Sequence, residues 1–186
     1  HRPRPTTPRL APLAEAEWDE ETRAILAPLA QSGRVLNIFG TLARHPPLLK
    51  RWLVFGTHVL AKSTLPARER ELVILRIGWL CRAEYEWGQH AAIGRLCGLT
   101  DDEIRRIPKG ADDPAWSPAD ALLLRATDEL HADACLSDAT WKALAASYGE
   151  QQIIDLIFAV GQYNLVSMAL NSLGVQREAG VEGFPE

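Results

Sequence analysis

Two long segments are apolar on nearly every side, and they constrain the fold of this chain more than any other feature. Residues 72–81 read Leu-Val-Ile-Leu-Arg-Ile-Gly-Trp-Leu-Cys, and residues 153–170 are similar. A helix without a polar face has to lie in the centre of a bundle or against another subunit. No apolar run approaches the roughly 20 residues that a membrane span needs. In a chain of 186 residues, two such helices favour an oligomer.

The remaining sequence is punctuated like a series of helices. Capping residues, prolines suited to a first helical turn and terminal glycines recur along it, at Pro66, Gly98, Thr100, Ser117, Ser137 and Gly174. No segment alternates with period two between turn dipeptides, so strands are not expected. The sequence therefore predicts an all-α, single-domain bundle of about seven to nine helices, over residues 17–29, 37–44, 47–62, 66–81, 84–96, 100–107, 118–132, 137–148 and 150–173.

The N-terminal 13 residues differ from the rest of the chain. They hold four prolines, so we expect an extended arm over residues 1–13 and the helical domain over residues 14–186. The net charge of −4 is mild, which argues against nucleic acid or an anionic membrane as a partner. The N-terminus lacks the apolar core of a signal peptide, so a cytoplasmic location is expected.

Cysteine content and motif content exclude several classes of site. The three cysteines, Cys81, Cys97 and Cys135, form no CxxC pair, which argues against a disulfide framework and a zinc ribbon. We expect each to behave as a small buried hydrophobe. No set of His, Cys and carboxylate residues shows strong metal spacing, and no phosphate-binding glycine loop is present. Neither a metal nor an organic cofactor is therefore expected.

A carboxylate and an imidazole share one face of the segment 84–96. Glu86 and His90 are four residues apart, so Glu86 can accept the imidazole N–H, fix its tautomer and raise its pKa. That is a common construction of a general acid/base. Glu71 lies roughly 15 Å from the turn before this helix and His90 roughly 9 Å, an offset that leaves direct contact uncertain. Arg76, at roughly 7.5 Å, is closer to the level of His90.

These residues fit a known motif. In the carboxymuconolactone decarboxylase / alkylhydroperoxidase D-like superfamily, a Glu is followed after eleven residues by Cys-x-x-Cys and, after three more, by a His. This chain resembles that superfamily, with Glu71 and His90 in the outer positions and Ala83 and Glu86 in place of the two cysteines. The likeness runs from about residue 10 to residue 185 and includes Arg44-His45-Pro46 and Gly161-Gln162-Tyr163-Asn164. The resemblance implies trimer-based assembly, as a homotrimer or homohexamer, with sites near subunit contacts.

The missing cysteines determine what the resemblance implies about activity. A dithiol mechanism needs two sulfurs that can meet, and Ala83 and Glu86 cannot supply them. The decarboxylase members also lack the pair. Resemblance to them implies a cofactor-independent lyase or isomerase that acts on a small carboxylated or carbonyl-bearing compound through an enolate-type intermediate. His90 would donate or accept the proton, Glu86 would orient it, and Glu71 would serve as a second acid/base group or a relay.

Other residues are candidates for binding the substrate. Arg76 could hold a substrate carboxylate as a bidentate fork. The remaining candidates would line the pocket, and they are Tyr85, Trp87, Trp79, His58 and Cys81.

Two alternatives stay open. One is a divergent peroxidase that uses Cys81 with an external thiol. The other is a non-catalytic small-molecule binder, in which His90 is a satisfied core histidine and Arg76 is a member of a buried ion pair.

Overall fold

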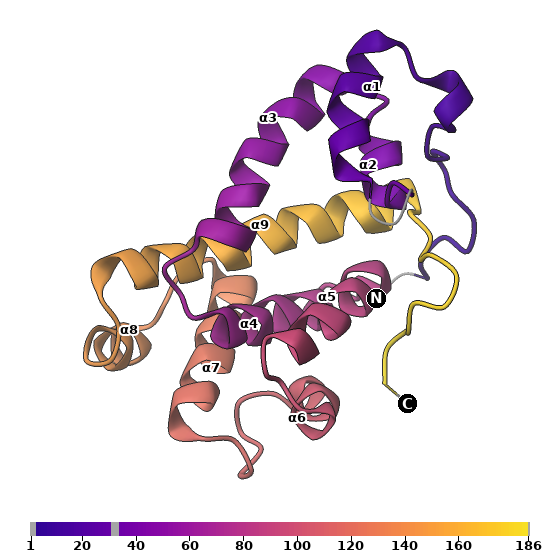
Figure 1. Cartoon of the computed structure of the whole chain (residues 1–186). Coiled ribbons are helices and arrows are strands. Elements are labelled where there is room, and N and C mark those ends of the chain that lie inside the picture. The colour runs from indigo at the N-terminus through magenta and orange to yellow at the C-terminus, as the bar shows by residue number, and fades with distance from the viewer. Residues whose placement is uncertain (1–2, 31–33, 186) are drawn as a thin grey trace.

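The computed structural model describes residues 3–30 and 34–185, and within these ranges it contains nine α-helices and no strand (Figure 1). The all-α prediction is confirmed. The helices are α1 (Glu20–Leu26), α2 (Asn37–Leu42), α3 (Pro46–Thr57), α4 (Ala67–Leu80), α5 (Glu84–Leu96), α6 (Asp101–Arg106), α7 (Pro118–Asp133), α8 (Asp138–Ala145) and α9 (Glu150–Leu173).

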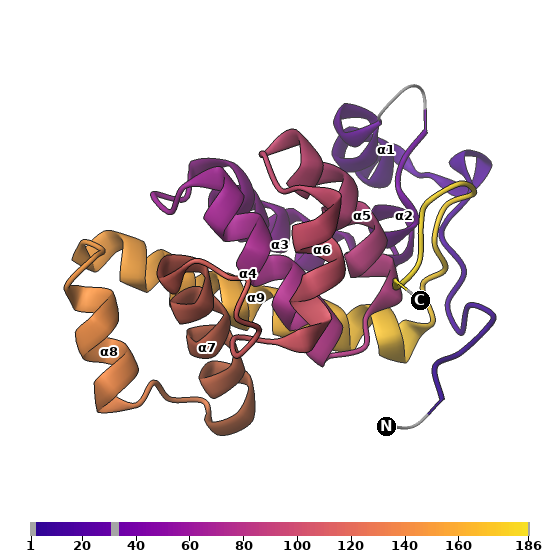
Figure 2. The same cartoon turned by 90° about the horizontal axis from the view of Figure 1, so that it is seen from below.

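Helix α4 is the centre of the bundle. It packs against α5, α7 and α9, and nine consecutive residues from Arg70 to Gly78 are buried. Figure 1 shows α9 lying between α1–α3 on one side and α4–α7 on the other. The view from below, in Figure 2, shows α4, α5 and α6 in front of α9. The apolar segment at residues 72–81 is thus covered by other helices, as its lack of a polar face requires.

Helix α9 is more apolar than the sequence analysis expected. By length and composition alone it could cross a membrane, which corrects the expectation that no apolar run approaches such a length. Half of that window is buried inside the fold, as in the core helix of a bundle. The outer face of α9 leaves large apolar side chains exposed, at Ile154, Phe158, Leu165 and Met168.

Four of the nine described α-helices start at a residue whose side chain caps the first turn. Thr100 forms the predicted capping box with Glu103, and Ser117 and Ser137 each accept a backbone N–H of the first turn. Three predicted helices are interrupted or shorter. The segment 17–29 contains α1 between two 3₁₀ turns, because Pro28 lacks the N–H that an α-helix would use. The segment 47–62 changes from α3 to a π-helical turn (His58–Lys62), and α8 ends at Ala145.

The cysteines lie at helix ends, so the expectation that all three are buried is wrong. Cys135 is exposed in the turn after α7, while Cys81 and Cys97, at the ends of α4 and α5, are partly exposed. A helix end faces solvent more often than the middle of a packed face, and periodicity alone did not place them.

The two ends of the chain lie side by side. The backbone N–H groups of Arg9 and Leu10 both donate to the carbonyl of Leu173, and the side chain of Gln176 donates to the carbonyl of Pro5. The N-terminal segment is therefore fastened to the end of α9 and to the C-terminal segment, residues 174–185. The division into an arm over residues 1–13 and a domain over 14–186 stays a prediction.

Candidate functional site

A three-residue turn places α5 antiparallel to α4. The N–H of Ala83 donates to the carbonyl of Gly78, and that of Arg82 donates to Trp79, which closes the end of α4. Arg82 adopts a left-handed conformation with φ of 53°, at a position where helix ends favour glycine. The turn brings the polar residues of α5 against the apolar helix α4.

Two carboxylates contact the imidazole of His90, one at each ring nitrogen. Its Nδ1 lies 2.6 Å from Oε2 of Glu71 on α4, and its Nε2 lies 2.9 Å from Oε1 of Glu86 on α5. All three residues are buried, with exposed fractions of 0% for Glu71, 4% for Glu86 and 5% for His90. Both ring nitrogens therefore have a protein partner in the interior.

Glu71 and His90 are in contact although they lie at different levels along α4 and α5, as their distances from the connecting turn predicted. Glu71 lies level with Gly94, one turn beyond His90, since a Cβ built on Gly94 would be 3.7 Å from the Cβ of Glu71. Gly94 has no side chain to occupy that space. The long side chain of Glu71 and the ring of His90 bridge the remaining distance. The helix arithmetic gave the correct offset, and the side chains make the direct contact that it left uncertain.

Two further residues complete the network. Nε of Arg70 donates to Oε1 of Glu71 at 3.1 Å, so each oxygen of Glu71 has its own partner. The ring of Tyr163 from α9 meets the His90 ring edge to face, with centroids 4.8 Å apart. Burial, followed by the charges of Glu86 and Glu71, raises the pKa of Tyr163 well above its usual value, so its phenol stays neutral.

The network fixes the charge of His90. Burial alone would lower its pKa, but the attraction and hydrogen bonds of Glu71 and Glu86 outweigh burial and raise the pKa to about 10. His90 is therefore an imidazolium at neutral pH and donates an N–H to each carboxylate. In this state it can give a proton but cannot accept one.

Arg76 does not take part in this network. Its Nε and Nη2 bind the carboxylate of Asp128 at 2.6 and 3.0 Å, and its Nη1 donates to the carbonyls of Ile107 and Pro108. Its level along α4 is close to that of His90, yet its side chain leaves on the α7 side. The structure thus places Arg76 in a buried ion pair, which was the alternative interpretation, and leaves it no free donor pair for a substrate.

The aromatic candidates lie at the start of α5, beside the C-terminal segment. Trp79 and Trp87 meet edge to face with centroids 5.8 Å apart, and both pack on Phe184. The hydroxyl of Tyr85 donates to Glu178 at 2.8 Å, and burial raises the pKa of this phenol. Trp79 and Trp87 are thus packing residues, whereas Tyr85 also lines a cavity.

The last two candidates lie apart from the His90 network. His58, in the π-helical turn, is 3.6 Å from Asp155 and largely exposed. Sγ of Cys81 donates to Oδ1 of Asn164 at 3.0 Å and lies 3.9 Å from Nδ1 of His131. Burial raises the pKa of the Cys81 thiol, which disfavours the reactive thiolate.

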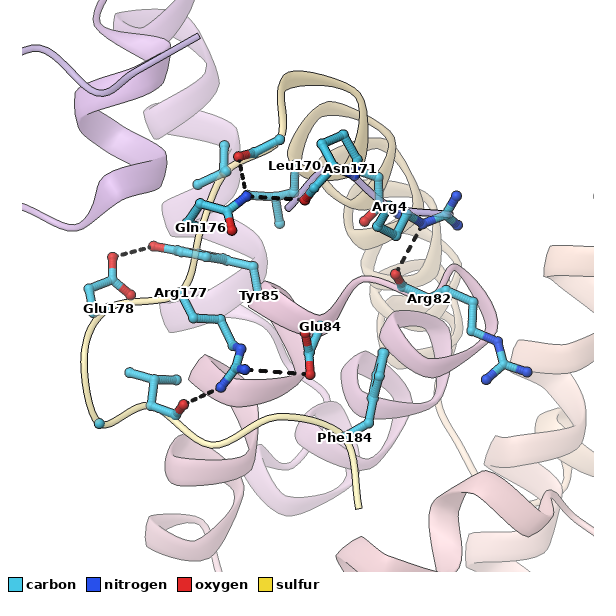
Figure 3. A pocket seen from close by; sticks show the side chains of 15 residues that line it. Arg4, Arg82, Glu84, Tyr85, Leu170, Asn171, Gln176, Arg177, Glu178 and Phe184 are labelled. Atoms are coloured by element: carbon cyan, nitrogen blue, oxygen red, sulfur yellow. Dashed lines mark hydrogen bonds and ion pairs between the residues drawn. The ribbon is translucent and has the colours of Figure 1, made fainter. Parts of the chain in front are cut away.

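A polar cavity of about 390 Å³ opens beside the N-terminal turn of α5 (Figure 3). Its walls are the N-terminal segment, the α4–α5 turn, the end of α9 and the C-terminal segment. Glu84 and Tyr85 line it, and Glu86 follows them on the side of the helix that faces the core. Among residues 3–30 and 34–185, no group of three or more His, Cys, Asp or Glu side chains could hold a metal ion.

Known proteins share both the sequence pattern and the fold. The model of the carboxymuconolactone decarboxylase family matches residues 46–129, which include Glu71, Glu86 and His90. Over these residues, which are fewer than half of the chain, the sequence is similar to the carboxymuconolactone decarboxylase family. No curated protein matches the chain.

Several solved structures have a similar fold over most of the chain. An uncharacterized peroxidase-related protein from Ralstonia eutropha JMP134, described as an alkylhydroperoxidase AhpD core, has a TM-score of 0.80 at 19% identity, covering 92% of this chain and 93% of its own. A peroxidase-related protein from Silicibacter sp. TM1040 has a TM-score of 0.78 at 16% identity, covering 94% and 93%. A variant of the debrominase Bmp8 in complex with 2,3,4-tribromopyrrole has a TM-score of 0.72 at 15% identity, covering 94% of each chain.

The sequence indicated some of the contacts around His90 and not others. The spacing of Glu86 and His90 predicted their contact, and the superfamily motif pointed to Glu71. The contribution of Arg70 was missed because neighbouring residues on a helix point in different directions. Tyr163 stood in a quoted motif without a role, and only the packing of α9 on α5 places its ring against His90.

Proposed function

We propose that the protein is a cofactor-independent lyase or isomerase that acts on a small carboxylated or carbonyl-bearing compound through an enolate-type intermediate. The observation that carries this proposal is the line of contacts from Glu71 through His90 to Glu86. Glu86 occupies the position of the second cysteine of the superfamily motif. A proton-transferring group therefore stands where relatives keep sulfur, next to the same Glu and His.

Glu86 is the group that we expect to exchange a proton with the substrate. Its Oε1 accepts the N–H of His90, whereas its Oε2 has no hydrogen bond to any residue in the described part of the chain. As a carboxylate it can remove a proton from a carbon beside a carbonyl, leaving the electron pair in an enolate, and return it to another carbon. In a decarboxylation the bond to the carboxylate breaks, carbon dioxide leaves, and the enolate carbon takes a proton that His90 passes on through Glu86.

A substrate can reach Glu86 only if part of the protein around it moves. Glu86 is 4% exposed, and the cavity of about 390 Å³ begins at its neighbours Glu84 and Tyr85. We expect the substrate to enter this cavity and to reach Glu86 through a local opening of the segments that cover the start of α5. Expulsion of water on closure would strengthen the electrostatic contacts of the network.

The proposal is tested by replacing Glu86, the group expected to transfer the proton, and measuring turnover. The Glu86→Gln variant should lose at least about a hundredfold in kcat on whichever member of a panel of lactone acids and β-keto acids the wild type converts, a typical acid/base contribution. Carbon dioxide release and enolate absorbance report turnover. Cys81→Ser serves as the control and should keep its rate. Full turnover by Glu86→Gln would refute the mechanism.

A second candidate is a non-catalytic small-molecule binder. The observation that favours it is the enclosure of His90, whose two nitrogens are bound and whose ring packs on Tyr163. In that case the network would only hold α4, α5 and α9 together, and no member of the panel would be converted. Ligand binding without turnover, unchanged in Glu86→Gln, would establish this alternative.

A further inference from the structure

Arg177 lines the cavity together with Arg4, which donates to the carbonyls of Cys81 and Arg82, and with Arg82, whose guanidinium lies over Trp79. We propose that the cavity beside the start of α5 binds the carboxylate of a small organic acid, and that Arg177 of the C-terminal segment is the residue that holds it. This inference rests on the proposed function, because it names the substrate class that the cavity would deliver to Glu86. Arg177 would then take the role for which the sequence favours Arg76.

Arg76 and Arg177 differ in how fully their guanidinium groups are paired, and this difference favours Arg177 as the ligand-binding residue. Arg76 is buried and bound by the bidentate carboxylate of Asp128. Arg177 is 34% exposed at its side chain, and its Nη2 is 3.6 Å from Oε1 of Glu84, beyond hydrogen-bond range. Its Nη1 donates to the carbonyl of Val181. One edge of the Arg177 guanidinium is thus weakly paired and available to a ligand.

Figure 3 shows how the charges of the cavity are arranged. The Arg177 side chain extends between the C-terminal segment and Glu84, while the carboxylate of Glu178 lies on the far side of Tyr85. Glu178 is already satisfied, since it accepts hydrogen bonds from Tyr85, Gln89 and the backbone of Asn37. Glu84 is the one lining carboxylate that a ligand would have to displace, and its side chain is 48% exposed. A guanidinium edge opposite a displaceable carboxylate is suited to bidentate recognition of another carboxylate.

The C-terminal segment holds Arg177 in place through contacts outside the cavity. The backbone of Glu182 and the side chain of Val181 rest on Gly88 of α5, where a side chain would not fit. The carboxylate of Glu182 pairs with Arg95, with its Oε1 2.6 Å from Nη1. The position of Arg177 is therefore set by the docking of its own segment, which reduces the entropy that ligand binding would cost.

Titration calorimetry on the full chain tests the proposal with defined probes. Succinate and benzoate serve as a linear and a cyclic carboxylate, and succinamide and benzamide serve as their neutral counterparts. The wild type should bind at least one carboxylate and neither amide. Arg177→Gln should weaken carboxylate binding by about tenfold or more, as expected for a charge-assisted hydrogen-bond pair. Glu84→Gln should tighten it several-fold, because the competing carboxylate is removed.

Further variants distinguish loss of the ligand contact from misfolding and from loss of turnover. Arg105→Gln removes an exposed arginine of α6 that pairs with Asp102 and does not line the cavity, so it should bind as the wild type does. Arg177→Lys should retain part of the affinity, which a merely misfolded variant would not. Glu86→Gln should bind normally even though the proposed function predicts that it turns over no substrate.

Arg177→Gln and Glu84→Gln are expected to change carboxylate affinity in opposite directions, so several results would contradict the inference. If the wild type binds neither carboxylate, or if it binds the amides equally well, the cavity is not a carboxylate site. Equal binding by Arg177→Gln, or weaker binding by Glu84→Gln, would remove Arg177 from the role. Normal carboxylate binding together with full turnover by Glu86→Gln would instead leave this inference standing and refute the proposed function.

Discussion

At the scale of single residues, the site is a row of alternating charges. Arg70, Glu71, His90 and Glu86 carry formal charges that sum to zero when His90 is an imidazolium. Burying charges is costly unless each has a partner, and removing one member leaves another unpaired in the interior. The row therefore behaves as a unit, and its protonation is tied to stability.

Stability should fall at alkaline pH because of His90. Its pKa is about 10 in the folded state against 6.5 for the unperturbed group, so the folded chain binds more protons between these values. The stabilisation is complete below pH 6.5 and is lost as pH rises through about 10, with a slope of at most about 1.4 kcal/mol per pH unit. Urea denaturation at several pH values measures it.

Glu86→Gln provides the comparison for this pH dependence. It removes one of the two carboxylates that hold the His90 proton, so the decline should begin at lower pH, and the NMR titration of His90 should shift the same way. The surface variant Glu15→Gln should leave the profile unchanged. A wild-type free energy of unfolding that stays flat from pH 7 to 10, alongside an unchanged His90 titration in Glu86→Gln, would contradict the charge assignment.

Arg82 is under backbone strain that glycine would relieve. Its φ of 53° lies in the left-handed region, which costs a non-glycine residue about 1–2 kcal/mol. Arg82→Gly should therefore raise the free energy of unfolding by about 0.5–1 kcal/mol in urea denaturation, since glycine also loses more entropy on folding. Ala134, with φ of 55°, is the matched position, and Ala134→Gly should have a similar effect. Destabilisation by Arg82→Gly alone would mean that its stacking on Trp79 outweighs the strain.

The sequence predicted the contact between candidate residues that share a helix, and it did not indicate which distant residues the fold brings to the cavity. Glu86 and His90 are linked by helical spacing alone. Arg177 lies 93 residues beyond Glu84 along the chain, and no local pattern connects them. Arg76 illustrates the opposite error, because its level along α4 was estimated correctly while the direction of its side chain depends on where α7 packs.

At the scale of elements, helix α9 presents an apolar stripe that the described residues leave exposed. Ile154, Phe158, Leu165 and Met168 are each about half exposed, and their spacing of four, seven and three residues keeps them on one face. Phe55 of α3 extends the stripe through an edge contact with Phe158. An apolar surface of this kind marks an interaction site. It suits the predicted homo-oligomer, trimeric or hexameric.

A charge placed in the stripe should reduce the size of the assembly. Phe158→Glu would bury a carboxylate in any interface formed there, so light scattering after gel filtration should report a lower mass than for the wild type. Trp141→Glu, on α8 and equally exposed at 51%, is the control and should leave the mass unchanged. If Phe158→Glu keeps the wild-type mass, the oligomer interface lies elsewhere.

The order and type of the helices were predictable because their signals are local. Caps at Thr100, Ser117 and Ser137 and the glycine after α9 specify where helices start or stop without reference to the rest of the fold. The π-helical turn after α3 was not predictable, since nothing local in residues 58–62 distinguishes it from a regular turn. The exposure of the α9 stripe was not predictable either, because sequence periodicity does not distinguish a face buried in the bundle from an apolar face that remains exposed.

At the scale of the whole molecule, the C-terminal segment depends on one glycine of α5. A Cβ on Gly88 would lie 2.6 Å from Cγ1 of Val181 and would meet the carbonyl of Glu182, so Gly88→Ala should displace the segment. We expect faster proteolysis after residue 174 and a lower free energy of unfolding. Gly56→Ala on α3 is the control, since its Cβ would find only ordinary contact, at 3.5 Å from Gln162, and alanine should stabilise the helix by about 0.5–1 kcal/mol. Equal behaviour of the two variants would show that the segment is not seated on Gly88.

The proximity of the two chain ends has a consequence for synthesis. One wall of the cavity joins Pro5 to Gln176, residues that are 171 positions apart. A growing chain can bring α4 and α5 together, and with them Glu71, Glu86 and His90, long before Gln176 leaves the ribosome. The charged row is thus available to an early folding unit, while the cavity exists only once residues 174–184 have been made. Removal of residues 3–5 or of residues 174–185 would then take away walls of the cavity and leave α4 and α5 in place.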